Sequence, residues 1–183
     1  MKHVLSKLTA LAAALLLAAS FAVAAPGASA QPSAKSIRKA LVMLPYYGVF
    51  DNLAYNVAAD GTVTLYGQVV RPSTKQDAEY SVKRVAGVTR VVNQIEVLPL
   101  SSFDDAIRAS AYRTIFDKGG LYRYAMGVNP SLHIVVNRGH LTLEGVVANE
   151  LDRRLAYAAA RSVPGAFTVT NNLRTDAEQR RAR

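Results

Sequence analysis

The chain repeats itself, and this repeat limits its possible folds more than any other feature of the sequence. The phrase VTLYGQV (63–69) returns 78 residues later as LTLEGVV (141–147), and the same ungapped offset holds from Gly61 to Asn171. It also pairs Ala78 with Ala156, Val85 with Val163, Gly87 with Gly165, Val91 with Val169 and Asn93 with Asn171. We therefore expect two copies of one module, joined by a very short linker at 98–102.

Each copy shows the same order of elements. Apolar residues at helical spacing predict a first helix in each copy. These residues are Ile37, Leu41 and Leu44 in the first copy and Phe103, Ile107, Ala111 and Ile115 in the second. Two strands with alternating apolar residues follow, then a second helix and a last strand.

The two hairpins differ in turn length. The turn spans 58–62 in the first copy and 137–140 in the second. A slip of one residue would turn every side chain of a strand to the other face. The apolar pattern therefore requires one extra turn residue in the first copy.

Several residues mark the ends of the predicted helices. Ser102 and Asp105 resemble a capping box, and Pro72 and Asn149 suit the starts of the second helices. Gly87 and Gly165 follow these helices where a residue of positive φ is favoured.

The element order predicts the architecture. The second helix of each copy is a crossover, so the last strand should run parallel to the strand before it. We predict an α+β fold of two tandem α-β-β-α-β modules (34–98 and 101–174), each a small three-stranded mixed sheet with two helices on one face. Gly67 and Gly145 fall on the inward face, where a missing side chain would let a helix approach closely. Together with Gly61, Gly87, Gly139 and Gly165, they are interpreted as structural glycines.

Residues 1–30 form a different kind of sequence. A positive start is followed by an almost unbroken apolar run (8–25) and by small residues of the A-x-A type (28–30). This pattern is typical of a cleaved secretory signal peptide, with a retained membrane anchor as the alternative. The chain has no cysteine, so a lipoprotein anchor is excluded. The expected location is the periplasm.

The expected mature chain, from Gln31, has 20 basic and 13 acidic residues and a net charge of +7. This excess favours anionic partners such as phospholipid headgroups or an acidic envelope protein. The alternative is that the charge only keeps the protein soluble. No nucleic-acid partner is expected, because export carries the chain out of the compartment that contains nucleic acid. The polar end, 175–183, is predicted to be a disordered basic tail that could add attraction to an anionic surface.

The combined pattern resembles the BON domain. The matching motifs are the hairpins GTVTLYGQV and GHLTLEGVV, the glycine after each second helix and the V-x-N of each last strand. The resemblance implies an exported, non-enzymatic envelope protein that binds phospholipid and acts in envelope maintenance or osmotic stress. A periplasmic adaptor or chaperone-like factor for other proteins is the alternative.

No catalytic, cofactor or metal site is expected. The mature chain has two histidines, His133 and His140, which we interpret as surface residues because no carboxylate is spaced to complete a metal site. Asp104 and Asp105 are explained by their place at a helix start. No small-molecule substrate is therefore predicted.

The candidate contact surface lies on the second module. On a helical wheel, aromatic and basic residues fall on the back of the first helix, and the segment 121–126 extends the mixture. Aromatic residues beside arginines suit the interface of a membrane. The predicted membrane or partner contacts are Arg108, Tyr112, Arg113, Phe116, Lys118, Tyr122 and Arg123. The alternative is that this back face packs against the first module or against 121–126.

Overall fold

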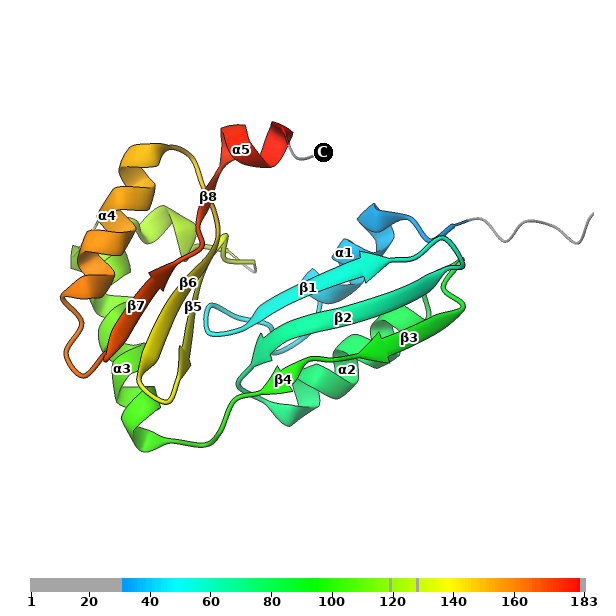
Figure 1. The fold of residues 1–183 in the computed structure, drawn as a ribbon, viewed down its shortest axis with the longest axis horizontal. Coiled ribbons are helices and arrows are strands. Elements are labelled where there is room, and N and C mark those ends of the chain that lie inside the picture. The colour runs from blue at the N-terminus through cyan, green and yellow to red at the C-terminus, as the bar shows by residue number, and fades with distance from the viewer. Residues whose placement is uncertain (1–30, 119, 128, 182–183) are drawn as a thin grey trace, which may run out of the picture.

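The computed structural model describes residues 31–118, 120–127 and 129–181, and the predicted signal peptide lies outside them. The first module contains α1 (Ala34–Val42), β1 (Asn52–Val57), β2 (Thr62–Val69), α2 (Pro72–Lys83), β3 (Arg90–Asn93) and β4 (Glu96–Val97) (Figure 1). The second contains α3 (Ser102–Tyr112), the π-helix η1 (Arg113–Lys118), the 3₁₀ helix η2 (Tyr122–Tyr124), β5 (Leu132–Asn137), β6 (His140–Val147), α4 (Glu150–Arg161), β7 (Thr168–Asn171), β8 (Arg174–Thr175) and α5 (Asp176–Arg181). No helix of the described part has the length and apolar character needed to cross a bilayer.

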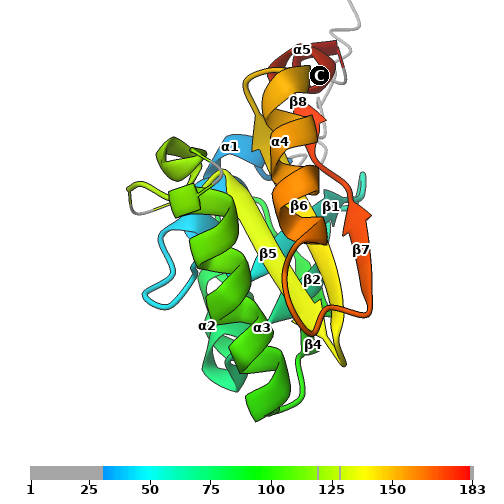
Figure 2. The ribbon, with the colours of Figure 1, turned by 90° about the vertical axis from the view of Figure 1, so that its left-hand side faces the viewer.

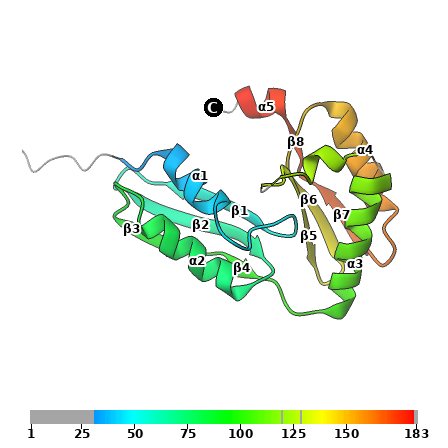
Figure 3. The same ribbon diagram turned by 180° about the vertical axis from the view of Figure 1, so that it is seen from behind.

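The two modules have the predicted topology. In each, the first two strands are antiparallel and the last strand runs parallel to the second. The helices of each module lie on one face of its sheet, as Figure 2 shows for α3 and α4 and Figure 3 for α1 and α2. Val57 pairs with Val63 but Val136 pairs with Leu141, which confirms the extra turn residue in the first hairpin.

Each last strand is interrupted, which was not predicted. An asparagine bridges each break: the side-chain oxygen of Asn93 accepts from the backbone N–H of Ile95 (3.2 Å), and its amide donates to the carbonyl of Lys75 in α2 (2.9 Å). Asn171 makes the equivalent bonds to Leu173 and Arg153. The V-x-N motif therefore ties the broken strand to the crossover helix.

Most predicted helix ends are confirmed. Pro72 is the first residue of α2, Asn149 caps α4, and Gly87 and Gly165 have positive φ. The predicted capping box at Ser102 and Asp105 is wrong, because Ser101 is the N-cap of α3 and its hydroxyl accepts from the N–H of Asp104.

The predicted core of α3 is correct only in part. Ile107, Ala111 and Ile115 are buried, but Phe103 is 47% exposed. Phe116, predicted on the back face, is fully buried. Phe116 lies in η1, and a π-helix has more residues per turn than an α-helix, so the α-helical wheel misplaces its ring.

The explanation predicted for the strand glycines is also wrong. All six structural glycines have positive φ, and Gly67 and Gly145 reach 116° and 114°. A Cβ on Gly145 would meet the backbone of Ser131 and Leu132 in the neighbouring chain segment rather than a helix. Gly67 and Gly145 therefore permit an unusual backbone conformation inside the hairpin of each module.

The predicted disorder of 175–183 is wrong for residues 175–181. Thr175 belongs to β8, which pairs with β6, and α5 follows directly. The start of α5 is fixed by Thr175 and Glu178, since the carboxylate of Glu178 accepts from the N–H of Thr175 (2.7 Å).

Candidate functional site

Two of the predicted contact residues are buried and cannot meet a membrane or a partner. Arg108 is 4% exposed, and its guanidinium forms an ion pair with Asp105 (2.5 Å) and donates to the carbonyl of Val136 (2.7 Å). Phe116 belongs to the core of the second module. Arg108 therefore fastens α3 to the edge of β5, and the prediction for both residues is wrong.

Tyr112 lies at the contact between the modules. Its ring is 6.3 Å from that of Phe50 in the first module and 5.0 Å from that of Phe116. The structure thus favours the alternative stated for the back face of α3, in which it packs against the first module.

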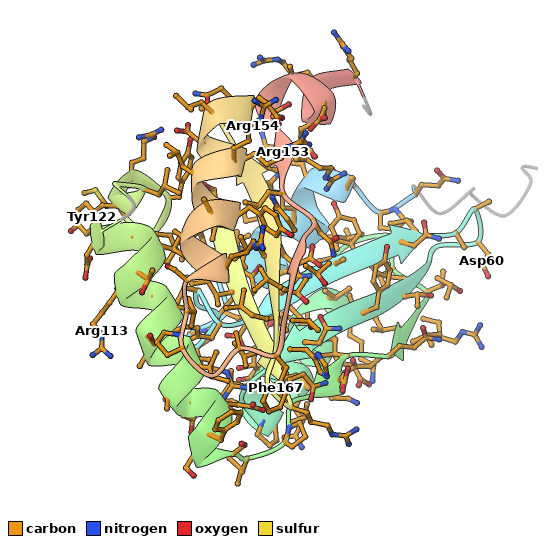
Figure 4. All side chains as sticks on the ribbon, turned by 60° about the vertical axis from the view of Figure 1, so that its left-hand side comes forward. Asp60, Arg113, Tyr122, Arg153, Arg154 and Phe167 are labelled. Carbon is orange, nitrogen blue, oxygen red and sulfur yellow. The ribbon has the colours of Figure 1, made fainter. Side chains whose placement is uncertain are left out.

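The remaining predicted contacts have different surroundings. Arg113 and Tyr122 are exposed and point away from the module in Figure 4. The side chain of Lys118 lies outside the described residues. Arg123 is exposed, but its guanidinium forms an ion pair with Asp152 (2.5 Å) at the start of α4. The structure therefore leaves Arg113 and Tyr122 as unengaged candidates.

Asp152 is the centre of a small polar cluster that holds η2 against α4. It accepts from the hydroxyl of Tyr124 (2.5 Å) and from Arg123, and the same hydroxyl accepts from the N–H of Ala148 (2.9 Å). Burial opposes ionisation of Asp152, but these hydrogen bonds prevail and hold its pKa below the usual value. The cluster has a structural role, because its groups satisfy one another.

His133 is not the surface residue that was predicted. It points away from the core of its own module, as strand parity requires, but the first module covers it and leaves it 7% exposed. Its Nδ1 lies 3.2 Å from the carbonyl of Gly48, and its Nε2 lies 3.4 Å from the hydroxyl of Tyr47. Burial lowers the pKa of His133 and raises the pKa of Tyr47 to about 12. Both groups are therefore neutral at neutral pH.

His140 is exposed, as predicted, and its Nδ1 lies 2.7 Å from the hydroxyl of Thr168. In the described part of the chain, no three His, Cys, Asp or Glu residues are grouped so that they could hold a metal ion. The two histidines lie in separate environments, one between the modules and one at a hairpin turn.

A pair of exposed phenylalanines of the second module lies where α3 begins and β6 and β7 start. We call this the second-module tip and define it by Leu100, Phe103, Arg138, His140, Arg161 and Phe167. Phe167 is 69% exposed and Phe103 47%, and their rings are 5.6 Å apart. Arg138, Arg161 and His140 are exposed around them. Figure 4 shows Phe167 at the end of the module opposite to Arg154.

The fold explains why these two phenylalanines stay exposed. The N–H of Phe167 donates to the carbonyl of Gly139 (2.8 Å), which fixes its backbone against the β5–β6 turn. Its ring lies over this turn, since a Cβ on Gly139 would be only 2.5 Å from it. Phe103 lies in the first turn of α3, beyond the end of the sheet. Neither ring has a core to enter.

The equivalent end of the first module is polar. The repeat offset places Asp60 opposite Arg138, Thr62 opposite His140 and Thr89 opposite Phe167. Asp60 accepts from Thr62, and the hydroxyl of Thr89 donates to the carbonyl of Asp60 (2.9 Å). Aligning the two copies position by position would have found this contrast from the sequence.

The fold and the tip define a class: a duplicated α-β-β-α-β protein that presents an aromatic and basic surface on one copy. The BON domain family model matches residues 34–99 and 104–177. The chain belongs to the BON domain family, which is associated with phospholipid binding and osmotic-stress proteins and is generally non-catalytic.

Comparison with known structures adds no functional argument. The chain is similar to a structure of CdsD, a structural protein of the Type III secretion system of Chlamydia trachomatis, with 12% identity and a TM-score of 0.31 over 81% of this chain and 95% of that one. A structure of the C-terminal domain of CdsD gives 13% identity and a TM-score of 0.28 over 76% and 95%. Among curated proteins, no significant match is found.

Proposed function

We propose that this chain is a non-enzymatic, exported envelope protein whose BON modules associate with anionic phospholipid surfaces in the periplasm and help to maintain the envelope, including under osmotic stress. The observation that carries the proposal is the second-module tip. It combines exposed phenylalanine rings with arginines, a combination suited to the boundary between headgroups and acyl chains.

The chemistry of the tip favours a membrane with anionic lipids. Phe103 and Phe167 can enter the acyl boundary, while Arg138 and Arg161 remain at the level of the phosphates. Two acids near the exposed arginines are already engaged within the module. Asp104 is buried and accepts from the backbone N–H groups of Arg138 and Gly139, and Asp105 is paired with Arg108.

The strength of the contact can be estimated. Complete burial of a phenylalanine contributes about 1.5–3 kcal/mol, and the exposed portions of Phe103 and Phe167 together amount to little more than one such side chain. Each arginine near an anionic surface adds about 1 kcal/mol. A total near 4 kcal/mol corresponds to a Kd of about 1 mM. The tip alone thus gives weak, reversible and salt-sensitive binding.

Vesicle flotation tests this proposal. The protein should float with phosphatidylglycerol or cardiolipin vesicles, only weakly with phosphatidylcholine vesicles, and less at high salt than at low salt. The double variant Phe167→Thr and Arg138→Asn should lose most of this binding. The threonine copies the first module, and asparagine tolerates the positive φ of Arg138.

A matched variant distinguishes the tip from the surface predicted by the sequence. Arg113→Glu with Tyr122→Ala changes two exposed side chains of the second module that lie outside the tip. This variant should bind vesicles more tightly than the tip variant does. If it abolishes flotation while the tip variant leaves flotation unchanged, the tip is not the contact surface. If the unmodified protein floats at low salt with neither phosphatidylglycerol nor cardiolipin vesicles, membrane association itself is refuted.

A further inference from the structure

A small hollow opens on the second module beside the ring of Phe167. Its volume is about 360 Å³, and it lies between the end of α4 and the start of β7. We call it the α4–β7 hollow and define it by its lining, which consists of Tyr157, Arg161, Ala166, Phe167, Thr168 and Val169. None of these described lining residues is acidic. The hollow adjoins the second-module tip, with which it shares Arg161 and Phe167.

Arg161 is the charged residue of the hollow, and its charge is not neutralised. It is exposed, and within the described part of the chain it forms no ion pair and no side-chain hydrogen bond. Its guanidinium carbon lies 5.9 Å from the centre of the Tyr157 ring. The planar guanidinium has five N–H donors in a geometry that matches the oxygen atoms of a phosphate. These donors therefore suit an anion that enters the hollow.

The first module has the same positions in a neutralised form. The repeat offset places Glu79 opposite Tyr157 and Lys83 opposite Arg161. Glu79 and Lys83 form an ion pair of 2.5 Å on α2. The second module thus has an aromatic residue where the first has the acid that pairs with its cation. This difference leaves the positive charge of Arg161 available.

The start of β7 adds a main-chain donor. Within the described sheet, β7 pairs only with β6 and is therefore an edge strand. The N–H of Phe167 donates to the carbonyl of Gly139, on the side of β6. Since successive residues of a strand direct their N–H groups to opposite sides, the N–H of Thr168 points away from β6. Thr168 lines the hollow, and no described group accepts from its N–H.

The last carbonyl groups of α4 are already engaged, which limits their repulsion of an anion. The carbonyl of Ala159 accepts from the N–H and from the hydroxyl of Ser162. The carbonyl of Ala160 accepts from the N–H of Val163. With Arg161 as the charged member of the lining, the ligand that fits this hollow is an anion rather than a cation.

We propose that the α4–β7 hollow binds the phosphodiester of an anionic phospholipid headgroup. Arg161 donates to the phosphate oxygens, and the N–H of Thr168 donates to the same group. The ring of Phe167 lines the hollow and contacts the acyl chains. A lipid therefore gains from both the charge and the ring, whereas free phosphate gains only from the charge. This proposal rests on the proposed function and deepens it, because it names the part of the lipid that the protein recognises.

A short-chain lipid tests the hollow without a membrane. Dihexanoylphosphatidylglycerol, kept below its micelle-forming concentration and titrated through about 1 mM, should saturably shift the NMR signals of the Thr168 amide and the Arg161 Nε–H. Inorganic phosphate at the same concentrations should shift them much less. Equal shifts with inorganic phosphate would overturn the assignment to lipid.

Matched variants test the role of the free charge. Tyr157→Glu copies the first module and gives Arg161 an acidic partner, so it should weaken lipid binding about tenfold. Tyr157→Phe keeps the ring without adding charge and should bind as the unmodified protein does. Arg161→Gln should also weaken binding about tenfold. Arg154→Gln should leave it unchanged, because Arg154 is paired with Glu150 at the other end of α4.

Two further results would overturn the proposal in variants whose amide spectra show an intact fold. One is that Tyr157→Glu binds the short-chain lipid as tightly as Tyr157→Phe. The other is that Arg154→Gln weakens binding as much as Arg161→Gln.

Vesicle flotation of the unmodified protein separates this proposal from the proposed function. If the protein floats but the short-chain lipid does not shift the Thr168 amide, the headgroup site is wrong and membrane association stands. If the lipid binds in the hollow but the protein does not float, the site stands and membrane association is refuted.

Discussion

Replacing Gly145 with alanine should strongly destabilise the second module. Gly145 has φ of 114°, a conformation that residues with a side chain rarely adopt, and this strain costs about 1–3 kcal/mol. An added Cβ would also lie within 3.0 Å of the carbonyl oxygen of Ser131, closer than real Cβ atoms approach. Separating β5 from β6 to relieve this overlap costs roughly another 1–3 kcal/mol.

The combined loss of about 4 kcal/mol is a large part of the total stability of a small domain. Urea unfolding followed by far-ultraviolet circular dichroism measures it directly, and Gly67→Ala should behave similarly in the first module. Gly48→Ala is the matched control, since no atom lies within 4 Å of its added Cβ and its φ is not positive. Its effect should stay within about 0.5 kcal/mol.

The size of the loss also decides between two explanations for the strand glycines. If a helix merely packed closely over Gly145, one methyl group could be accommodated by small movements of side chains. A loss below about 1 kcal/mol for Gly145→Ala would refute the argument from backbone conformation.

Two further predictions concern stability. Burial holds the pKa of His133 below its unfolded value near 6.5. The stability contributed by the neutral imidazole should therefore be complete above pH 6.5 and should be lost as the pH falls from 6.5 through the folded pKa. Urea unfolding at pH 7.5 and at pH 5 should show this loss, and His133→Gln should make the loss smaller. An unchanged slope in that variant would contradict the assignment. Asn93→Ala should cost about 1–2 kcal/mol in the same assay, because it leaves the N–H of Ile95 without its partner and removes the bonds from the Asn93 amide to Lys75 and Glu79. An effect near zero would show that the V-x-N bridge is dispensable.

The sequence predicted those parts of the fold that depend on local pattern. Helical spacing, strand alternation and the turn lengths fix the element order and the hairpin register, and the right-handed crossover fixes the direction of the last strand. The 100° wheel misplaced Phe116, because this residue lies in a π-helical segment in which the rotation per residue differs from that of an α-helix.

The candidate site was less predictable because it depends on how the modules meet. Arg108 and His133 have residue types typical of a surface, yet the edge of β5 and the loop before β1 cover them. Phe103 fits an apolar stripe but lies beyond the sheet that would bury it. The contrast between Phe167 and Thr89 was readable from the aligned copies, since it requires only the repeat offset.

The central claim is that the second-module tip enters the membrane. The chain has no cysteine, so a single introduced cysteine can carry an environment-sensitive fluorophore at a chosen position. Phe167→Cys, Thr89→Cys and Tyr122→Cys place the label at the tip, at the equivalent position of the first module and at a position of the second module outside the tip. On addition of phosphatidylglycerol vesicles, the emission at 167 should shift to the blue and that at 89 should not change. A shift at 89 or 122 with none at 167 would contradict the account.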